Sequence, residues 1–186
     1  MALEPYYKLT RAVAETLAGM YEVLFPEEYE RLKPAFEAGK WIIQDAGPWI
    51  GRALVYKLDV ELHLDENDAG PSVSFPCGDF TGGQMMVPQF EAKFRCVEQL
   101  VNDGRETSPP HTSYWPGHLC FFYSHSIFHR IAKWKPTRQG PNEATTPGRI
   151  GSVFFFPKPS FDILKDKPPG WGKRTGYGQW EGWVEA

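Results

Sequence analysis

Short apolar segments separated by turn-forming residues occupy the middle of this chain. This alternation of segments and turns constrains its fold more than any other feature. Strand character is found in Gln84–Pro88, which a proline stops, in Leu119–Tyr123, in Phe128–Ile131 and in the strongly apolar Gly148–Pro157. The turn-forming runs are Glu66–Pro71, Gly78–Gly83, Pro116–Gly117 and Ser124–Ser126. Seventeen prolines, eighteen glycines and 15% aromatic residues fit a loop-rich β protein better than a helical bundle.

The first forty residues have a helical pattern instead. Apolar residues recur at helical spacing at Leu9, Val13, Leu17, Tyr21 and Leu24. A second helix is expected to start near Pro26, with Glu27 and Glu28 in its first turn and Tyr29, Leu32 and Phe36 on its buried side. Pro34 is expected to end or kink this helix. We therefore expect helices that pack on the outside of a sheet.

Length, charge and cysteine content bound the class of protein. The 186 residues suit one domain, and the net charge of −3 gives no attraction to nucleic acid or anionic membranes. No segment has the apolar core of a signal peptide or the length of a membrane span. Cys77, Cys96 and Cys120 lack metal-ligand spacing and are expected to be free thiols in a reducing compartment. These features predict a soluble, intracellular (cytoplasmic) protein.

Two histidines and an aspartate are candidate metal ligands. His63 and Asp65 are two apart in a segment of strand character, so their side chains are expected to point the same way. His129 lies on a later strand. Two imidazoles and one carboxylate leave other positions of a divalent metal open, as in non-heme iron(II) oxygenases. His125 is the alternative to His129, although it lies in a predicted turn.

The order of these motifs resembles the double-stranded β-helix of the 2-oxoglutarate- and iron(II)-dependent dioxygenases, over roughly residues 53–157. The resemblance is closest to small fungal proteins related to prolyl 4-hydroxylase-type and TET/JBP-type dioxygenases. The residues that carry it are His63-Leu64-Asp65, Phe80-Thr81-Gly82-Gly83-Gln84, Pro116-Gly117, Phe121-Phe122, His129-Arg130, Arg149 and Ser152.

The fold that this resemblance implies is mainly β (α+β), a jelly-roll or cupin-like barrel with N-terminal packing helices. The expected organisation is a single dioxygenase domain over residues 1–186. Residues 1–40 would be helical support, 41–157 the β-helix core, and 158–186 a tail packed on the barrel.

The resemblance also implies the roles of individual residues. Fe(II) would be held by His63, Asp65 and His129, and the cosubstrate 2-oxoglutarate would chelate it. Arg149 would pair with the distal carboxylate of 2-oxoglutarate, because a guanidinium can grip a carboxylate with two hydrogen bonds. Ser152 or Tyr56 could add a hydroxyl donor. With O2, such an enzyme oxidises a C–H bond of a small-molecule or amino-acid-like substrate and releases succinate and CO2.

Two departures from the family pattern leave alternatives open. The segment Lys133–Pro147 inserts a polar, proline-containing loop between His129 and Arg149, so Arg130 and Arg138 are rivals for the cosubstrate role. We prefer Arg149 because it enters a strand. The run Cys96–Ser113 is a second insertion, near the barrel mouth, and is a candidate substrate lid.

Other functions remain as alternatives. An oxygenase of modified nucleobases would need a basic surface that the sequence lacks, and a catalytically silent β-helix binding module would be expected to have lost a ligand. Aromatic and basic residues alternate in the tail from Pro168 to Trp183, but their expected role is to cover the barrel. The expected partner is a small-molecule substrate, without nucleic acid or membrane, and no feature indicates an oligomeric state.

Overall fold

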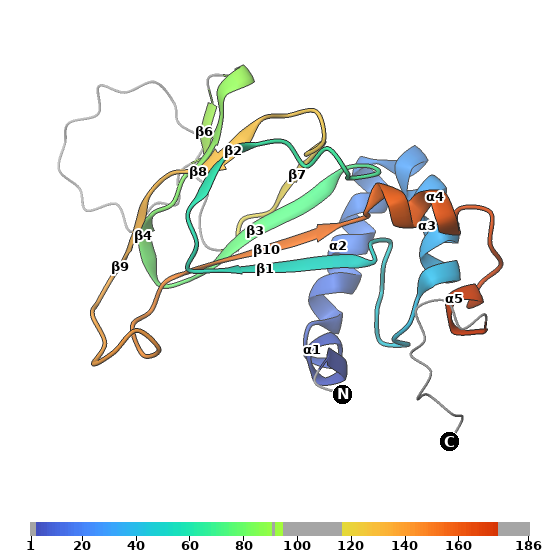
Figure 1. The fold of residues 1–186 in the computed structure, drawn as a ribbon, viewed down its shortest axis with the longest axis horizontal. Coiled ribbons are helices and arrows are strands. Elements are labelled where there is room, and N and C mark those ends of the chain that lie inside the picture. The colour runs from blue at the N-terminus through green and yellow to red at the C-terminus, as the bar shows by residue number, and fades with distance from the viewer. Residues whose placement is uncertain (1–2, 91, 95–116, 175–186) are drawn as a thin grey trace. The chain divides into compact units, whose positions relative to one another are not determined.

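The computed structural model describes residues 3–90, 92–94 and 117–174, and it combines helices with antiparallel sheets (Figure 1). Contacts divide the chain into two compact units. The first contains the described residues of 1–51, 67–70 and 155–186, and the second contains those of 52–66 and 71–154. The single domain expected from chain length stays a prediction.

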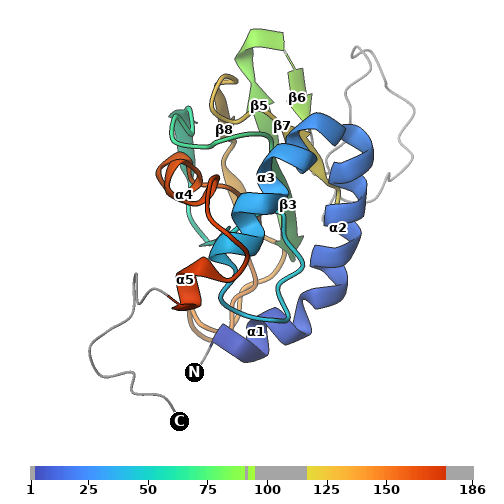
Figure 2. The same cartoon turned by 90° about the vertical axis from the view of Figure 1, so that its right-hand side faces the viewer.

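The first unit is helical (Figure 2). Its helices are α1 (Leu3–Leu9), α2 (Arg11–Leu24), α3 (Pro26–Gly39), α4 (Lys158–Leu164) and α5 (Trp171–Arg174). Helix α3 is central, since it contacts α2, α4 and α5. The ring of Tyr21 packs edge-on against Trp49, with centroids 4.8 Å apart, and both side chains are fully buried.

The buried face of α2 differs from the predicted one. Its buried residues are Ala14, Leu17, Ala18 and Tyr21, which follow the i, i+3, i+4, i+7 pattern. Leu9 is 83% exposed because the helix breaks at Thr10, which leaves Leu9 in α1. Val13 and Leu24 flank the buried stripe and are exposed.

Helix α3 begins as predicted, with a proline in its first turn followed by two glutamates. Leu32 and Phe36 are buried, whereas Tyr29 is half-buried. Of the two effects predicted for Pro34, the end of the helix was wrong, because α3 continues beyond it for more than a turn, and the kink stays a prediction. Packing of the buried face outweighs the hydrogen bond that the proline removes.

The strands belong to the second unit, apart from Gly51 and Phe155 at two strand ends. Sheet A has the order β1-β10-β3-β7, sheet B has the order β2-β8-β5-β6, and β4 pairs with β9. The bounds are β1 (Gly51–Tyr56), β2 (Val60–His63), β3 (Ser72–Gly78), β4 (Phe80–Gly82), β5 (Met85–Val87), β6 (Ala92–Phe94), β7 (Cys120–Phe122), β8 (His129–Ile131), β9 (Trp134–Pro136) and β10 (Arg149–Phe155). A 3-10 turn (Pro88–Phe90) follows β5.

These strands form nested pairs. Strands β5 and β6 form the innermost pair; outside them, β3 pairs with β7, β2 with β8, and β1 with β10. Successive pairs lie alternately in sheets B and A. The eight strands of these pairs therefore follow the order of one long antiparallel hairpin divided between two sheets, whereas the β4–β9 pair falls outside this order.

The two sheets share one apolar core. Phe80, Met85 and Val87 are its buried centre, and Cys120 and Phe122 of sheet A pack against them. Further contacts come from Ile127, Ile131 and Trp134. The face of sheet A that carries Cys120 and Phe122 is therefore turned towards sheet B, and we call it the inner face.

Two segments that were predicted as turn and loop contain a strand pair. Strand β4 lies in Gly78–Gly83 and β9 lies in Lys133–Pro147, and the two pair with Gly82 opposite Trp134. Gly82 has a φ of +78°, and a Cβ there would lie 2.5 Å from the carbonyl oxygen of Lys133. The glycine that suggested a turn thus permits close approach of the partner strand.

Several predictions concern residues that the structure does not describe. These are the lid at Cys96–Ser113, the thiol of Cys96, and the tail aromatics Tyr177, Trp180 and Trp183. Where the chain is described, Cys77 and Cys120 are free thiols, as predicted. No helix in this described part is long and apolar enough to cross a membrane.

Because Cys120 is buried, we predict that its thiol reacts slowly with alkylating reagents. Removal from water raises the pKa of Cys120 to about 11, so its nucleophilic thiolate is scarce near neutral pH. We expect iodoacetamide to alkylate Cys120 far more slowly than a free cysteine near pH 8, with the rate rising roughly tenfold per pH unit up to the pKa. Peptide mass spectrometry over time measures this. Alkylation of Cys120 in the native protein at the rate of a free cysteine would contradict its burial.

Candidate metal centre

His63 and His129 face each other across strands β2 and β8. The two residues are direct partners in the antiparallel pairing, so their side chains project from the same face of sheet B. Their ring centroids lie 4.2 Å apart. The pairing thus brings together two imidazoles that are far apart in the sequence.

A β-bulge produces this alignment. Val60 lies opposite Ile131 and His63 opposite His129, so Glu61 and Leu62 together oppose one residue of β8. Both bulge residues are exposed. Had the register at Val60 continued unbroken, Leu62 would oppose His129 and His63 would point to the other face.

Backbone carbonyls set the proton position on both imidazoles. Nδ1 of His63 lies 2.7 Å from the carbonyl oxygen of Glu61, and Nδ1 of His129 lies 3.0 Å from that of Ile127. A carbonyl oxygen can only accept, so each Nδ1 carries the hydrogen. In the neutral imidazole, Nε2 then carries the lone pair, which is the form that binds metals.

Asp65 reaches the two imidazoles from outside the strand. The prediction that it lies on the same strand as His63 was wrong, because β2 ends at His63. The backbone N–H of Asp65 donates to the carbonyl oxygen of Ser124 at 3.1 Å. Ser124 is fully buried and its hydroxyl lies 2.9 Å from that of Ser72. The turn after β7 therefore holds the segment that carries the carboxylate.

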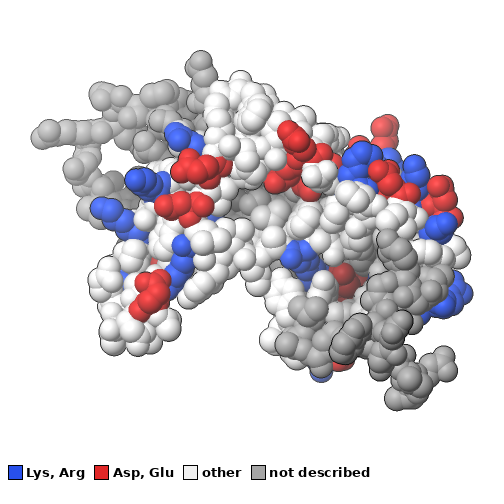
Figure 3. Space-filling model, viewed as in Figure 1, with Lys and Arg blue, Asp and Glu red and all other residues white. Residues whose placement is uncertain are grey.

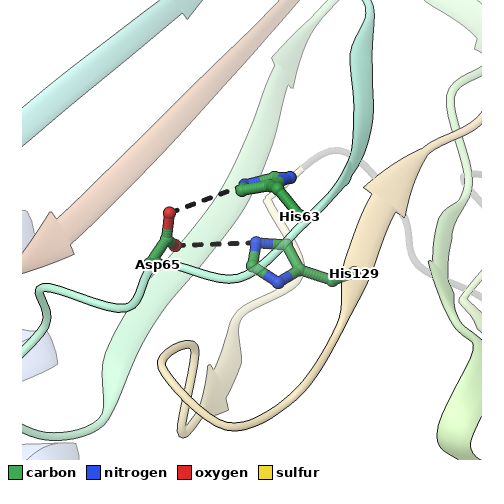
Figure 4. Close-up of side chains that lie close together, drawn as sticks. All are labelled: His63, Asp65 and His129. Carbon is green, nitrogen blue, oxygen red and sulfur yellow. Dashed lines mark ion pairs between the residues drawn. The ribbon is translucent and has the colours of Figure 1, made fainter.

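The three side chains converge on one point (Figure 4). The carboxylate oxygens of Asp65 lie 3.5 Å from Nε2 of His63 and 3.6 Å from Nε2 of His129. One ligand atom from each residue lies within 4.8 Å of the others. Ligands bound about 2.1 Å from one ion are about 3 Å apart at right angles. These separations suit a single divalent cation.

The electrostatics of the cluster also favour a cation. Separations of 3.5 and 3.6 Å exceed those of normal hydrogen bonds. With hydrogen on Nδ1, both Nε2 lone pairs face the carboxylate, an arrangement that is repulsive without a positive charge between them. Protonating both rings would instead place two like charges side by side. A metal ion relieves both repulsions.

Exposure is uneven around the cluster. The side chain of His129 is 9% exposed, whereas those of His63 and Asp65 are 37% and 36% exposed. The ring of Phe122 packs edge-on against His129, with centroids 4.9 Å apart. One side of the cluster is therefore packed and the other is open, as a catalytic metal requires.

The other histidines that the structure describes do not belong to this cluster. His125 is in the turn after β7, as predicted, where its ring packs edge-on against Tyr123. Among the described residues, the potential metal-binding group contains His129 and neither His125 nor His118. His111 lies outside the described residues.

Arg149 lies on the inner face of sheet A. Cys120 is opposite Ser74, and Ser74 is opposite Val153, so strand alternation places Val153 and Arg149 on that face. Arg149 is 3% exposed, and its guanidinium carbon lies 5.9 Å from the centroid of the Phe80 ring.

Two glycines make room for this side chain. A Cβ at Gly83 would lie 3.2 Å from Nε of Arg149, and one at Gly151 would lie 3.1 Å from its Nη1. Sequence reasoning missed this role. The signal was Gly151 inside a strongly apolar strand, because a glycine there often marks the close approach of another group.

The two candidate hydroxyl donors, Ser152 and Tyr56, point away from Arg149. Ser152 is buried on the outer face of sheet A, opposite Phe75. Tyr56 is 53% exposed and alternates with Val55, which lies beside Gly151 on the inner face. Their roles as hydroxyl donors stay predictions, without support from this placement.

The rival arginines lie at the surface. Arg130 is exposed, and the side chain of Arg138 is 78% exposed with an ion pair of 3.8 Å to Asp79. A buried arginine gains more from binding a carboxylate than an exposed one does, because water competes less. Burial therefore favours Arg149 over both rivals.

Comparison with known proteins assigns no family. No family model matches the chain, and no curated protein sequence matches it. Inferences about the site therefore depend on its geometry.

Alanine substitution tests the ligand set. We expect His63→Ala, Asp65→Ala and His129→Ala each to lower Fe(II) affinity by at least roughly tenfold, because each removes one ligand atom. His125→Ala is the matched control and should bind as the unaltered protein does. Anaerobic calorimetry measures the affinity, and circular dichroism checks the fold. Loss of binding in His125→Ala, with normal binding in His129→Ala, would assign the ligand to His125.

Proposed function

We propose that this protein is an Fe(II)- and 2-oxoglutarate-dependent oxygenase that oxidises a C–H bond of a small-molecule or amino-acid-like substrate. One observation carries the proposal. Two imidazole Nε2 atoms and a carboxylate converge at an open site, while a buried arginine lies on the inner face of the facing sheet. Neither the ligand set nor the buried arginine alone would be specific. Together they match the two requirements of this chemistry, a metal site and a residue that can bind the distal carboxylate of 2-oxoglutarate.

The strand order supports the corresponding fold, a double-stranded β-helix. A jelly roll is a long antiparallel hairpin rolled into two sheets. Strands β1, β2, β3, β5, β6, β7, β8 and β10 are nested in that way. The pair β4 and β9 is then an insertion next to strands β5 and β8 of sheet B. In this fold the ligands would come from β2, the segment after it and β8, and the arginine from β10.

The donor set favours iron, although it is not unique to iron. Two histidines and one carboxylate hold Fe(II) in oxygenases, and Zn(II) in some hydrolases. The buried Arg149 supports the choice of iron, because a metal-dependent hydrolase has no need of a dicarboxylate cosubstrate. At 3% exposure water competes little with a ligand, so the guanidinium could form strong charge-assisted hydrogen bonds to a bound carboxylate.

The protein's own residues would hold and orient the reactants. When bound, Fe(II) with 2-oxoglutarate supplies the oxidising chemistry, in which O2 is consumed and succinate and CO2 are released. His63, Asp65 and His129 would hold the metal from one side. The planar fork of Arg149 would bind the distal carboxylate with two hydrogen bonds. Phe122, packed against His129, would keep water from the covered side of the ligand set.

Surface charge favours a small substrate over nucleic acid. On the face drawn in Figure 3, Lys and Arg side chains of the described residues are interspersed with Asp and Glu and form no continuous basic stripe. Binding to a phosphate backbone depends on such a stripe. We therefore propose small molecules or amino-acid-like compounds as the substrate class.

Anaerobic absorption spectroscopy tests the function. We expect Fe(II) and 2-oxoglutarate together to produce a metal-to-ligand charge-transfer band in the unaltered protein. Admission of air should then release succinate in step with consumption of 2-oxoglutarate. The absence of both the band and the succinate would contradict the proposal. A band produced with Zn(II) would show that it does not report iron chemistry.

Arg149→Lys tests the cosubstrate arginine. We expect this variant to bind 2-oxoglutarate roughly 10- to 100-fold more weakly, because lysine keeps the charge but loses a charge-assisted hydrogen bond. Fe(II) affinity should hardly change. Arg138→Lys is the matched control for an exposed arginine. Normal 2-oxoglutarate affinity in Arg149→Lys, with a large loss in Arg138→Lys, would move the role to Arg138.

A further inference from the structure

The indole N–H of Trp134 is a buried donor. Its Nε1 is shielded from solvent and has no hydrogen-bond acceptor within the part of the chain that the structure describes. An indole nitrogen can only donate, and burying it unpaired costs free energy. A bound ligand that accepts a hydrogen bond from this N–H would explain why an unpaired donor is buried here.

Trp134 shares a wall of the core with Arg149. It lies on β9 opposite Gly82, on the same face of the β4–β9 pair as Phe80. Its side chain packs against the cluster that contains Phe80, and the guanidinium of Arg149 lies over the ring of that same phenylalanine. Trp134 and Arg149 therefore border one region inside the second unit.

A glycine before Arg149 brings the indole close to the start of β10. The Cη2 atom of Trp134 lies 2.9 Å from the position that a Cβ at Gly148 would take. Gly148 is buried and directly precedes Arg149. A side chain at this position would displace the indole ring.

We propose that the indole N–H of Trp134, together with Arg149, binds the distal carboxylate of 2-oxoglutarate. This inference rests on the proposed function. A carboxylate can accept about four hydrogen bonds, and a guanidinium fork takes two of them, so positions remain for a neutral donor. Ser152 and Tyr56 were predicted for that place, but both lie on the outer face of sheet A. Trp134 instead offers a buried donor and packs against the cluster whose Phe80 ring Arg149 covers.

The proposal makes Trp134 a determinant of cosubstrate specificity. A donor pair of one guanidinium and one N–H binds 2-oxo acids that have a distal carboxylate more tightly than those that lack it. 2-Oxopentanoate has the same chain length as 2-oxoglutarate and lacks the distal carboxylate. Comparing the two compounds isolates this contact.

Trp134→Phe removes the N–H and keeps most of the ring. We expect this variant to bind Fe(II) normally and 2-oxoglutarate about tenfold more weakly, as the loss of a hydrogen bond to a charged group predicts. Its affinity for 2-oxopentanoate should match that of the unaltered protein. Trp41→Phe, in the helical unit, is the control and should change neither affinity. The anaerobic charge-transfer band measures all of these affinities.

Equal 2-oxoglutarate affinity in Trp134→Phe and the unaltered protein would overturn the assignment while leaving the proposed function intact. A similar loss for both 2-oxo acids would also overturn it, by showing that the indole only supports the pocket wall. Lack of a band in the unaltered protein would reject the proposed function and this inference together.

A measurement on unaltered protein avoids dependence on the variant's folding. With diamagnetic Zn(II) in the site, the Trp134 indole N–H resonance should move downfield when 2-oxoglutarate is added and should stay in place with 2-oxopentanoate. An indole resonance that responds equally to both compounds, or to neither, would contradict the contact.

Discussion

The pairing of His63 with His129 across β2 and β8 is the constraint on which the site depends. A single bulge at Glu61 and Leu62 aligns these histidines, and it turns both bulge side chains outward. The carbonyl of Glu61 then accepts the Nδ1 hydrogen of His63. The same irregularity therefore sets the direction of the imidazole and its tautomer, which explains how a short strand can present a candidate metal ligand.

The nested strand pairs determine which residues of sheet A face sheet B. Because sheets A and B enclose one core, the inner face of sheet A is turned towards the sheet that carries the histidines. Strand alternation decides which residues of β10 can take part. Arg149 and Gly151 lie on the inner face, while Ser152 lies on the outer one. The resemblance implied a hydroxyl donor from Ser152 or Tyr56, and we propose an indole donor from β9 in its place.

Sequence alone predicted the features that depend on local patterns. Composition and turn residues indicated a β protein, and the contrast between a predicted turn at His125 and a predicted strand at His129 favoured His129 as the ligand. The sequence did not predict the pairing of residues that are distant in the chain. Gly82 suggested a turn but permits β4 to approach β9. Asp65 was predicted on the strand of His63 but lies beyond the end of that strand. In the apolar stripe predicted for α2, Leu17 and Tyr21 are buried, but Leu9 belongs to α1 because the helix breaks at Thr10. Such features depend on partners that are distant in the chain.

Anomalous diffraction from a crystal soaked with Mn(II), a stand-in for Fe(II), tests the account most directly. The account predicts one strong peak about 2.1 to 2.3 Å from Nε2 of His63, Nε2 of His129 and a carboxylate oxygen of Asp65. Coordination through either Nδ1 atom would contradict the tautomers that the carbonyls of Glu61 and Ile127 impose. A peak away from these residues, or no peak at saturating metal, would contradict the metal centre itself.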